Sequence, residues 1–302
     1  MKKLLLSVCI LSLALAAHAK LNVVATLPDF GALAEVVGGD KVKVTSLARG
    51  AEDPHFVDAR PSYIRVLNQA DVLLEGGAEL EVGWLPPLVN NARNAKILGD
   101  ASGHVDMSRG LVLLDLPTGP VDRSQGDVHP LGNPHFWLDP SNAKLMAARL
   151  AQVFGQVDSA NAAFYADNAR KFAQLIDAKM AAWSRALEPH RGVKVVTYHK
   201  SFDYLLKPFG LVAAGTLEPK PGIEPSPNHI KALVPRMKSE GVKLILIETF
   251  RPHRTPEKVA AETGAKLLIL PASVGAVPKA SDYVGLIDYN VAQIAAALHA
   301  AK

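Results

Sequence analysis

Short apolar runs alternate with helix-forming segments along the whole chain, in two series separated by one long helical stretch. The runs are bounded by Gly, Pro, Asn or Asp, which is typical of buried strands. Strands that alternate with helices favour parallel sheets covered by helices. The sequence therefore predicts an α/β protein with two lobes, each of them a mainly parallel sheet flanked by helices.

The strands are predicted at similar intervals in both series. The first series has candidate strands at residues 21–27, 42–47, 71–75 and 95–98. The second series has candidates at 193–198, 211–215, 242–247 and 265–270. Helical segments lie between them, and a last helix is predicted from about 281 to 301.

The stretch between the two series, residues 141–187, contains no proline and a single glycine, Gly155. Its apolar residues recur at helical spacing, which predicts two helices broken near residues 157–159. We expect a long, rigid helix here to join the lobes; a helical hairpin inside one domain is the alternative. The predicted division is an N-terminal lobe over 20–150, a linking helix over 151–190 and a C-terminal lobe over 191–302.

The first 19 residues have the pattern of a cleaved secretory signal peptide. A cationic start, Met1-Lys2-Lys3, precedes an apolar run over 4–16 and the small-residue site Ala17-His18-Ala19. The run is shorter than the roughly 20 residues of a spanning helix. The only cysteine, Cys9, lies inside this segment, so the predicted mature protein has no thiol for disulfide or metal chemistry.

Charge excludes one class of partner. The chain has 33 Lys and Arg against 29 Asp and Glu, and the two signs are interspersed. Because no basic stripe or basic-aromatic interleaving is present, nucleic-acid binding is not expected.

Four polar side chains follow predicted strands or end proline-marked segments. His55 follows the 42–47 strand, His199 ends the 193–198 strand, and Glu248 ends the 242–247 strand. His135 lies just before the long helical stretch, between Pro134 and Pro140. Ligands of open parallel sheets bind at the carboxyl ends of strands, and imidazole is the commonest protein ligand for zinc-like ions. We therefore predict a metal site between the two lobes, with His55, His135, His199 and Glu248 as ligands.

Five motifs occur in an order that resembles the cluster A-I solute-binding proteins of bacterial ABC transporters for zinc and manganese. They are Asp53-Pro54-His55 with Arg60-Pro61-Ser62, Pro134-His135-Phe136-Trp137-Leu138-Asp139-Pro140, Tyr198-His199-Lys200-Ser201-Phe202, Glu224-Pro225-Ser226-Pro227, and Tyr283-Val284-Gly285-Leu286-Ile287-Asp288-Tyr289-Asn290. The resemblance implies two lobes joined by a rigid helix, and one ion held between them by His55, His135 and His199.

One position departs from the family pattern. Many members supply a fourth ligand, an aspartate, after the last strand, and the aligned residue here is Ala272. Glu248 is the preferred replacement, because it lies at the same sheet edge, and a contact to a ligand imidazole is its alternative role. Glu52, His129 and water remain open as the fourth ligand.

The expected function is binding and delivery rather than catalysis. Three imidazoles with at most one carboxylate favour Zn²⁺, whereas Mn²⁺ prefers more oxygen donors. We expect a monomeric periplasmic zinc-binding protein that serves an ABC permease, with a periplasmic metallochaperone as a further candidate partner. A manganese-binding protein of the same type, a zinc hydrolase with Glu248 as general base, and a metal-binding adhesin are the alternatives.

Overall fold

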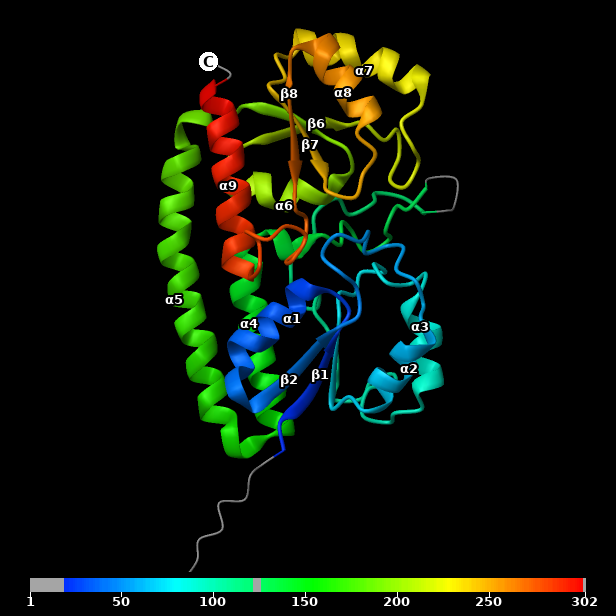
Figure 1. Ribbon diagram of the computed structural model, residues 1–302, viewed down its shortest axis with the longest axis vertical. Coiled ribbons are helices and arrows are strands. Elements are labelled where there is room, and N and C mark those ends of the chain that lie inside the picture. The colour runs from blue at the N-terminus through cyan, green and yellow to red at the C-terminus, as the bar shows by residue number, and fades with distance from the viewer. Residues whose placement is uncertain (1–18, 122–125, 301–302) are drawn as a thin grey trace, which may run out of the picture.

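The computed structural model describes residues 19–121 and 126–300, so the predicted signal peptide lies almost wholly outside the described residues. Two lobes lie one above the other along the longest axis, with a long helix beside both (Figure 1). The two-lobed α/β architecture predicted from the sequence is therefore confirmed. The ranges predicted for the individual lobes stay predictions.

The N-terminal lobe contains a four-stranded sheet in the order β2-β1-β3-β4. Its strands are β1 (Leu21–Ala25), β2 (Val42–Ser46), β3 (Val72–Glu75) and β4 (His104–Asp106). Every pairing in this sheet is parallel. The two central strands, β1 and β3, are largely apolar and buried, as expected for a sheet that is covered by helices on both sides.

The C-terminal lobe repeats this arrangement with the order β6-β5-β7-β8, again with parallel pairings. Its strands are β5 (Lys194–Thr197), β6 (Val212–Thr216), β7 (Leu244–Glu248) and β8 (Lys266–Leu270). The carboxyl ends of both sheets point toward the boundary between the lobes (Figure 1). Residues that follow the strands are thereby brought to a shared boundary.

Helices cover both faces of each sheet. The helices of the N-terminal lobe are α1 (Pro28–Gly38), α2 (Pro61–Asn68) and α3 (Leu85–Ala92); those of the C-terminal lobe are α6 (Asp203–Leu206), α7 (Pro227–Ser239), α8 (Arg254–Thr263) and α9 (Tyr283–Ala300). Proline at the first helical position starts α1, α2 and α7, where its missing N–H costs nothing. Among the helices of the described residues, none is long and apolar enough to cross a membrane.

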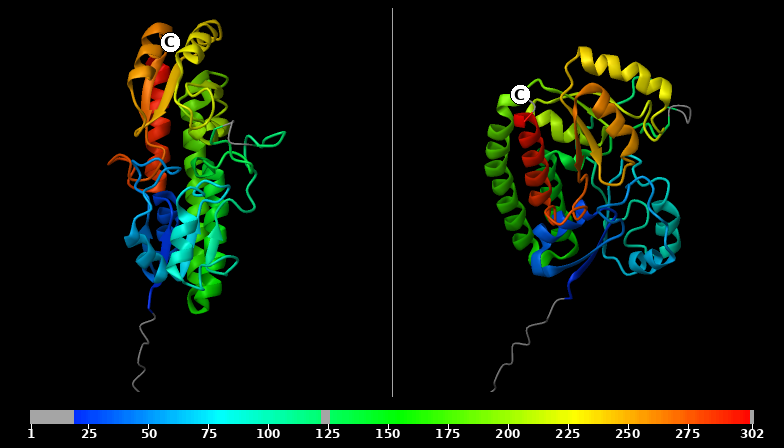
Figure 2. Two further views of the ribbon diagram at one scale, coloured as in Figure 1. Left: turned by 90° about the vertical axis from the view of Figure 1, so that its right-hand side faces the viewer. Right: turned by 45° about the horizontal axis from the view of Figure 1, so that its top comes forward.

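The predicted break in the central helical stretch is confirmed. Helix α4 (Pro140–Val157) ends at Asp158, and α5 (Ala162–Leu187) begins after a single 3-10 turn. The two helices pack as a hairpin, and α5 extends alongside both lobes (Figure 2). The sequence left two alternatives open, a rigid helix that joins the lobes and a helical hairpin. The structure combines them, because α4 and α5 form a hairpin and α5 also runs beside both lobes.

The strand predicted at residues 95–98 is wrong. These residues form turns, and the fourth strand of the sheet is β4 at His104–Asp106. The Asn94 side chain donates to the carbonyls of Leu67 and Ala70, and Ile97 N–H donates to the Asn94 carbonyl. Asn94 therefore fixes a turn, and Ile97 is apolar because it is buried against α2 and α3.

Candidate metal centre

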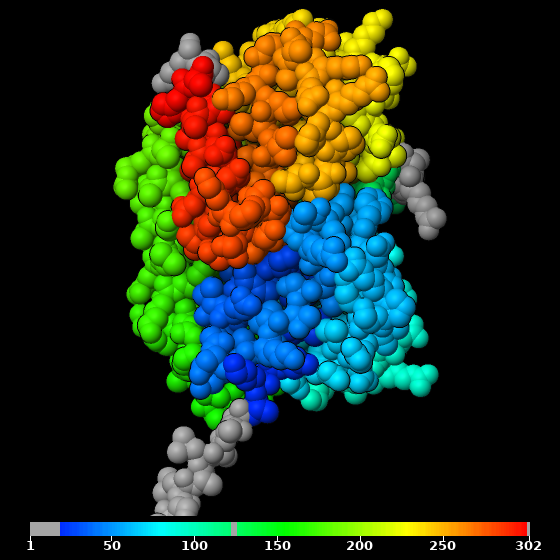
Figure 3. Space-filling model, viewed as in Figure 1, coloured from blue at the N-terminus to red at the C-terminus, as the bar shows by residue number. Residues whose placement is uncertain are grey.

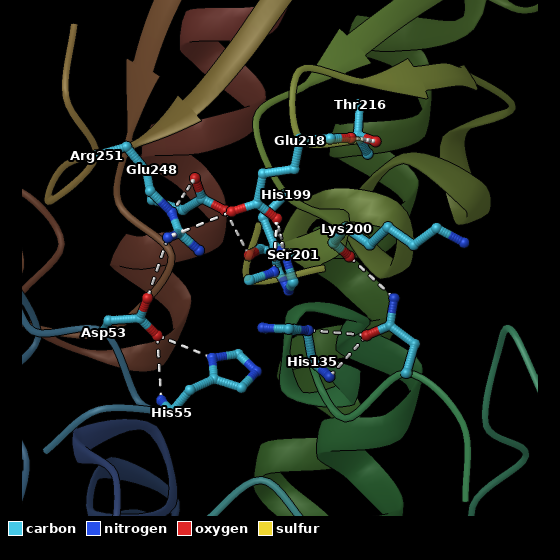
Figure 4. Close-up of polar contacts among 12 residues, drawn as sticks. Asp53, His55, His135, His199, Lys200, Ser201, Thr216, Glu218, Glu248 and Arg251 are labelled. Carbon is cyan, nitrogen blue, oxygen red and sulfur yellow. Dashed lines mark hydrogen bonds and ion pairs between the residues drawn. The ribbon is translucent and has the colours of Figure 1, made fainter. Parts of the chain in front are cut away.

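Three imidazoles from distant parts of the chain meet at the boundary between the lobes. The ring centroids lie 5.1 Å apart for His55 and His135, 5.4 Å for His55 and His199, and 5.1 Å for His135 and His199. One ligand atom from each ring lies within 4.8 Å of the other two. His135 and His199 are buried, and the His55 side chain is 7% exposed. This spacing allows one ion to contact all three rings (Figure 4).

Each histidine is placed by the local structure around it. His199 follows β5 by two residues, and His135 immediately precedes the 3-10 turn Phe136–Leu138 that leads into α4. His55 lies in a turn of the loop after β2. Trp84 Nε1 donates to the Pro54 carbonyl at 3.0 Å, which ties that loop to the start of α3.

An oxygen acceptor faces Nδ1 of each ring. Asp53 Oδ1 lies 2.8 Å from His55 Nδ1, Asn133 Oδ1 lies 2.9 Å from His135 Nδ1, and Glu218 Oε2 lies 2.7 Å from His199 Nδ1. An ionised carboxylate can only accept, so the Nδ1 atoms facing Asp53 and Glu218 carry the proton. The lone pair of those rings is then on Nε2, the arrangement that metal-binding histidines require.

Burial and neighbouring charge shift the pKa values of His135 and Asp53. Burial, together with the charges of His199 and His55, holds the pKa of His135 well below its usual value. Burial acts to raise the pKa of Asp53, but hydrogen bonds from His55 and the charges of His55 and Arg251 outweigh it and lower that pKa to about 2. His135 is therefore neutral across the physiological pH range, which leaves its ring able to bind a cation, and Asp53 is an ionised acceptor.

The structure does not bring Glu248 into the group of three. Its carboxylate is fully buried, with Oε1 2.5 Å from Ser201 Oγ and Oε2 3.5 Å from Arg251 Nε. Burial raises its pKa, and the charges of Arg251 and His199 oppose that rise. Glu248 thus lies beside the centre, where its contacts are to Ser201 and Arg251.

The other candidates for a fourth ligand lie at different places. Glu52 is partly exposed. Its carboxylate accepts from the Arg49 N–H at 2.9 Å and contacts Arg60 at 3.4 Å. The Ala272 carbonyl accepts from Trp137 Nε1 at 2.8 Å, so this segment is held against the start of α4. His129 lies nearer the three histidines His55, His135 and His199, which we call the triad. Its ring centroid is 5.2 Å from that of His55.

His129 lines two cavities that meet the triad from different sides. One, of about 430 Å³, also borders His55; the other, of about 130 Å³, also borders His135 and His199. Its Nε2 is buried and has no hydrogen-bond partner among the described residues. Burial, followed by the charges of His55 and His199, lowers its pKa to about 3, while a hydrogen bond to the Ala78 backbone opposes this.

Sequence reasoning missed the residues that orient the triad, above all Glu218 and Arg251. Glu218 follows β6 by two residues, and Arg251 follows β7 by three. The rule that ligands gather at the carboxyl ends of parallel strands places both at the correct sheet edge, but it does not show which groups they contact. Asn133 and Asp53 could have been found from the sequence, because each is a polar residue two positions before a candidate ligand.

A model of the family "Zinc-uptake complex component A periplasmic" matches residues 23–297. The chain therefore belongs to this family of solute-binding proteins, which confirms the resemblance inferred from the five motifs.

Individual relatives cover nearly the whole chain. The manganese ABC transporter substrate-binding lipoprotein PsaA of Streptococcus anginosus is 27% identical over 287 residues, 92% of this chain and 89% of that protein. The high-affinity zinc uptake system protein ZnuA of Paracoccus denitrificans is 29% identical over 322 residues, 94% of each chain. The structure of the SBP FpvC from Pseudomonas aeruginosa in complex with Mn²⁺ matches with a TM-score of 0.78 and 26% identity, over 94% of this chain and 100% of that one.

Proposed function

We propose that this protein is the metal-capturing component of an ABC importer, and that its cargo is a divalent cation bound by His55, His135 and His199. The convergence of three imidazoles within 4.8 Å of one another carries the proposal. Family membership supports it, since relatives are named as substrate-binding proteins of metal transporters. A site between two lobes also suits a carrier, because relative movement of the lobes changes access to the ion.

The donor set favours zinc as the cargo. Relatives are named for manganese and for zinc, so the ion is argued from the ligands. Three neutral nitrogen donors suit tetrahedral Zn²⁺, whereas Mn²⁺ prefers carboxylate and carbonyl oxygen. Ala272 removes a carboxylate that the family resemblance leads one to expect, and Glu248 is engaged with Ser201 and Arg251.

We propose His129 as the fourth donor. Its unpartnered, buried Nε2 and its place on both cavities support this role. A hydrogen bond to the Ala78 backbone holds the His129 ring, as oxygen acceptors hold the rings of His55, His135 and His199. A small movement of the segment that carries His129 would complete a site of four imidazoles.

Delivery follows from the transporter class. The loaded protein docks on a membrane permease in the periplasm and releases the ion to it, without chemical turnover. A zinc hydrolase would need Glu248 as general base; its contacts to Ser201 and Arg251 give it another role.

Removal of one imidazole tests the proposed site. His135→Ala is expected to lower zinc affinity by more than about 100-fold, because even loss of an outer acceptor costs such sites about 10- to 100-fold. Affinity is measured by competition with a chelator, and folding by circular dichroism. His253→Ala is the matched control, since His253 is exposed. Unchanged affinity in a folded His135→Ala protein would overturn the proposed site.

The physiological ion needs a test in cells, because most nitrogen-rich sites bind Zn²⁺ more tightly than Mn²⁺ in vitro. A strain that lacks this gene is expected to grow poorly when zinc is chelated and normally when manganese is limited. The wild-type gene should restore growth, and His135→Ala should not. A growth defect confined to manganese limitation would refute zinc as the cargo.

A further inference from the structure

Arg251 lies at the boundary between the lobes and contacts carboxylates from both. It follows β7 in the C-terminal lobe, and its side chain is 14% exposed. The guanidinium lies 3.3 Å from Asp53 Oδ2, 3.5 Å from Glu218 Oε1 and 3.5 Å from Glu248 Oε2 (Figure 4). Asp53 belongs to the N-terminal lobe, so one of these ion pairs crosses the boundary.

Two of these carboxylates also orient the triad, each through its second oxygen. Asp53 uses Oδ2 for Arg251 and Oδ1 for His55; Glu218 uses Oε1 for Arg251 and Oε2 for His199. A continuous series of contacts therefore runs from His55 through Asp53, Arg251 and Glu218 to His199. Two ligands from opposite lobes are held relative to each other through one guanidinium.

We propose that Arg251 is the positioning residue of the metal centre, which couples closure of the lobes to the orientation of His55 and His199. This inference rests on the proposed function. Separation of the lobes breaks the Arg251–Asp53 pair and frees the acceptor that orients His55. Closure restores both contacts together, so that the high-affinity geometry exists only in the closed protein.

The chemistry of arginine suits this role. Its planar guanidinium presents five donors, which lets one side chain serve three carboxylates, whereas lysine offers a compact point charge. The guanidinium carbon lies 5.1 Å from the ring centroid of Tyr198 and 5.2 Å from that of Phe250, and cation–π contacts of this kind fix its plane. Without Arg251, the buried carboxylates would repel one another.

Substitution of Arg251 tests the proposal in the full-length mature protein. Arg251→Met is expected to lower zinc affinity about 10- to 100-fold, the range seen when contacts to ligand residues are lost. Arg251→Lys is expected to fall between Arg251→Met and the wild type, because it keeps the charge and loses the planar donors. The visible spectrum of bound Co²⁺ should shift in both variants. Arg254→Met is the control, since Arg254 is exposed at the start of α8.

A mutant cycle separates positioning from a general effect on folding. In the wild-type background, Asp53→Asn and Glu218→Gln are expected to change zinc affinity non-additively, because Arg251 connects them. In the Arg251→Lys background their effects should become closer to additive. Two results would overturn the role of Arg251: equal coupling in both backgrounds, or zinc affinity within twofold of wild type in folded Arg251→Met. Retained zinc binding in His135→Ala would instead overturn the proposed function.

Discussion

Asn133 holds His135 by two hydrogen bonds, one to the ring Nδ1 and one to the backbone N–H at 3.0 Å. Its own amide is fixed by the Lys200 carbonyl at 2.9 Å. Asn133→Ala removes the acceptor of Nδ1, so the ring loses its fixed tautomer and orientation. We expect zinc affinity to fall about 10- to 100-fold, as measured by chelator competition. Asn91→Ala, at an exposed asparagine, should leave the affinity unchanged.

His129 provides a second prediction at the scale of single residues. If its Nε2 is the fourth donor, His129→Ala should weaken zinc binding at least about tenfold and leave an exchangeable water on bound Co²⁺. Glu52→Ala should alter neither property, because Glu52 contacts Arg49 and Arg60 instead. Wild-type affinity and an unchanged Co²⁺ spectrum in His129→Ala would contradict the assignment.

The triad itself could be predicted from sequence, but the contacts that orient it could not. His55 and His199 follow strand ends, and parallel topology brings such positions to one edge. Arg251 offers no such certainty, because a charged residue after a strand is usually solvated. Its contact with Asp53, almost 200 residues earlier, is a tertiary one that only the structure reveals.

Helix α5 is anchored to the C-terminal lobe through Trp183. The indole is buried, and its Nε1 donates to Asp288 Oδ1 of α9 at 2.7 Å, while Lys179 contacts the other oxygen. Trp183→Ala should cost about 3–5 kcal/mol of unfolding free energy, measured by urea denaturation. Leu175→Ala, at a position that is 46% exposed on the same helix, should cost less than about 1 kcal/mol. Similar costs for both would show that α5 is not fixed through this contact.

Elements with strong local signals were predicted well, and those defined by long-range contacts were not. Helix α7 carries strong local signals, since the Ser226 side chain caps it and Pro227 starts it. Strand β4 has one apolar residue, Val105, between two polar ones. A segment of this length is too short to show hydrophobic periodicity. It becomes a strand through its pairing with β3, a tertiary contact that the local sequence does not reveal. The turn at residues 95–98 misleads in the opposite way. Ile97 is apolar and buried, which resembles a strand residue, but it lies in a turn.

The lobes also meet at a second place, away from the triad. The segment after β8, orange in Figure 3, is seated against the N-terminal lobe. Asp29 of α1 accepts from the Ser273 hydroxyl and from the Val274 N–H, the latter at 3.1 Å. A Cβ added to Gly50 would lie 2.1 Å from the Val274 carbonyl oxygen. Glycine is therefore required at position 50 for the lobes to approach this closely.

Burial at this contact raises the pKa of Asp29 to about 7, although hydrogen bonds from Ser273 and Val274 oppose the rise. The folded protein therefore holds this proton more tightly than the unfolded chain, in which the pKa is about 3.8. The resulting stability is fully present below about pH 4 and is lost as the pH rises through about 7. The carboxyl group is completely buried, so the change can reach about 4 kcal/mol.

Comparison of the metal-free wild type with Asp29→Asn isolates this effect. Asparagine keeps the shape but does not ionise, so the unfolding free energy of the wild type should fall relative to that of the variant between pH 4 and pH 8. Glu81, whose pKa burial and the Glu75 charge raise to about 8, acts in the same direction, but it is present in both proteins and cancels in the difference. A difference independent of pH would mean that Asp29 is ionised in the folded protein, and that the contact between the lobes does not respond to pH through this residue.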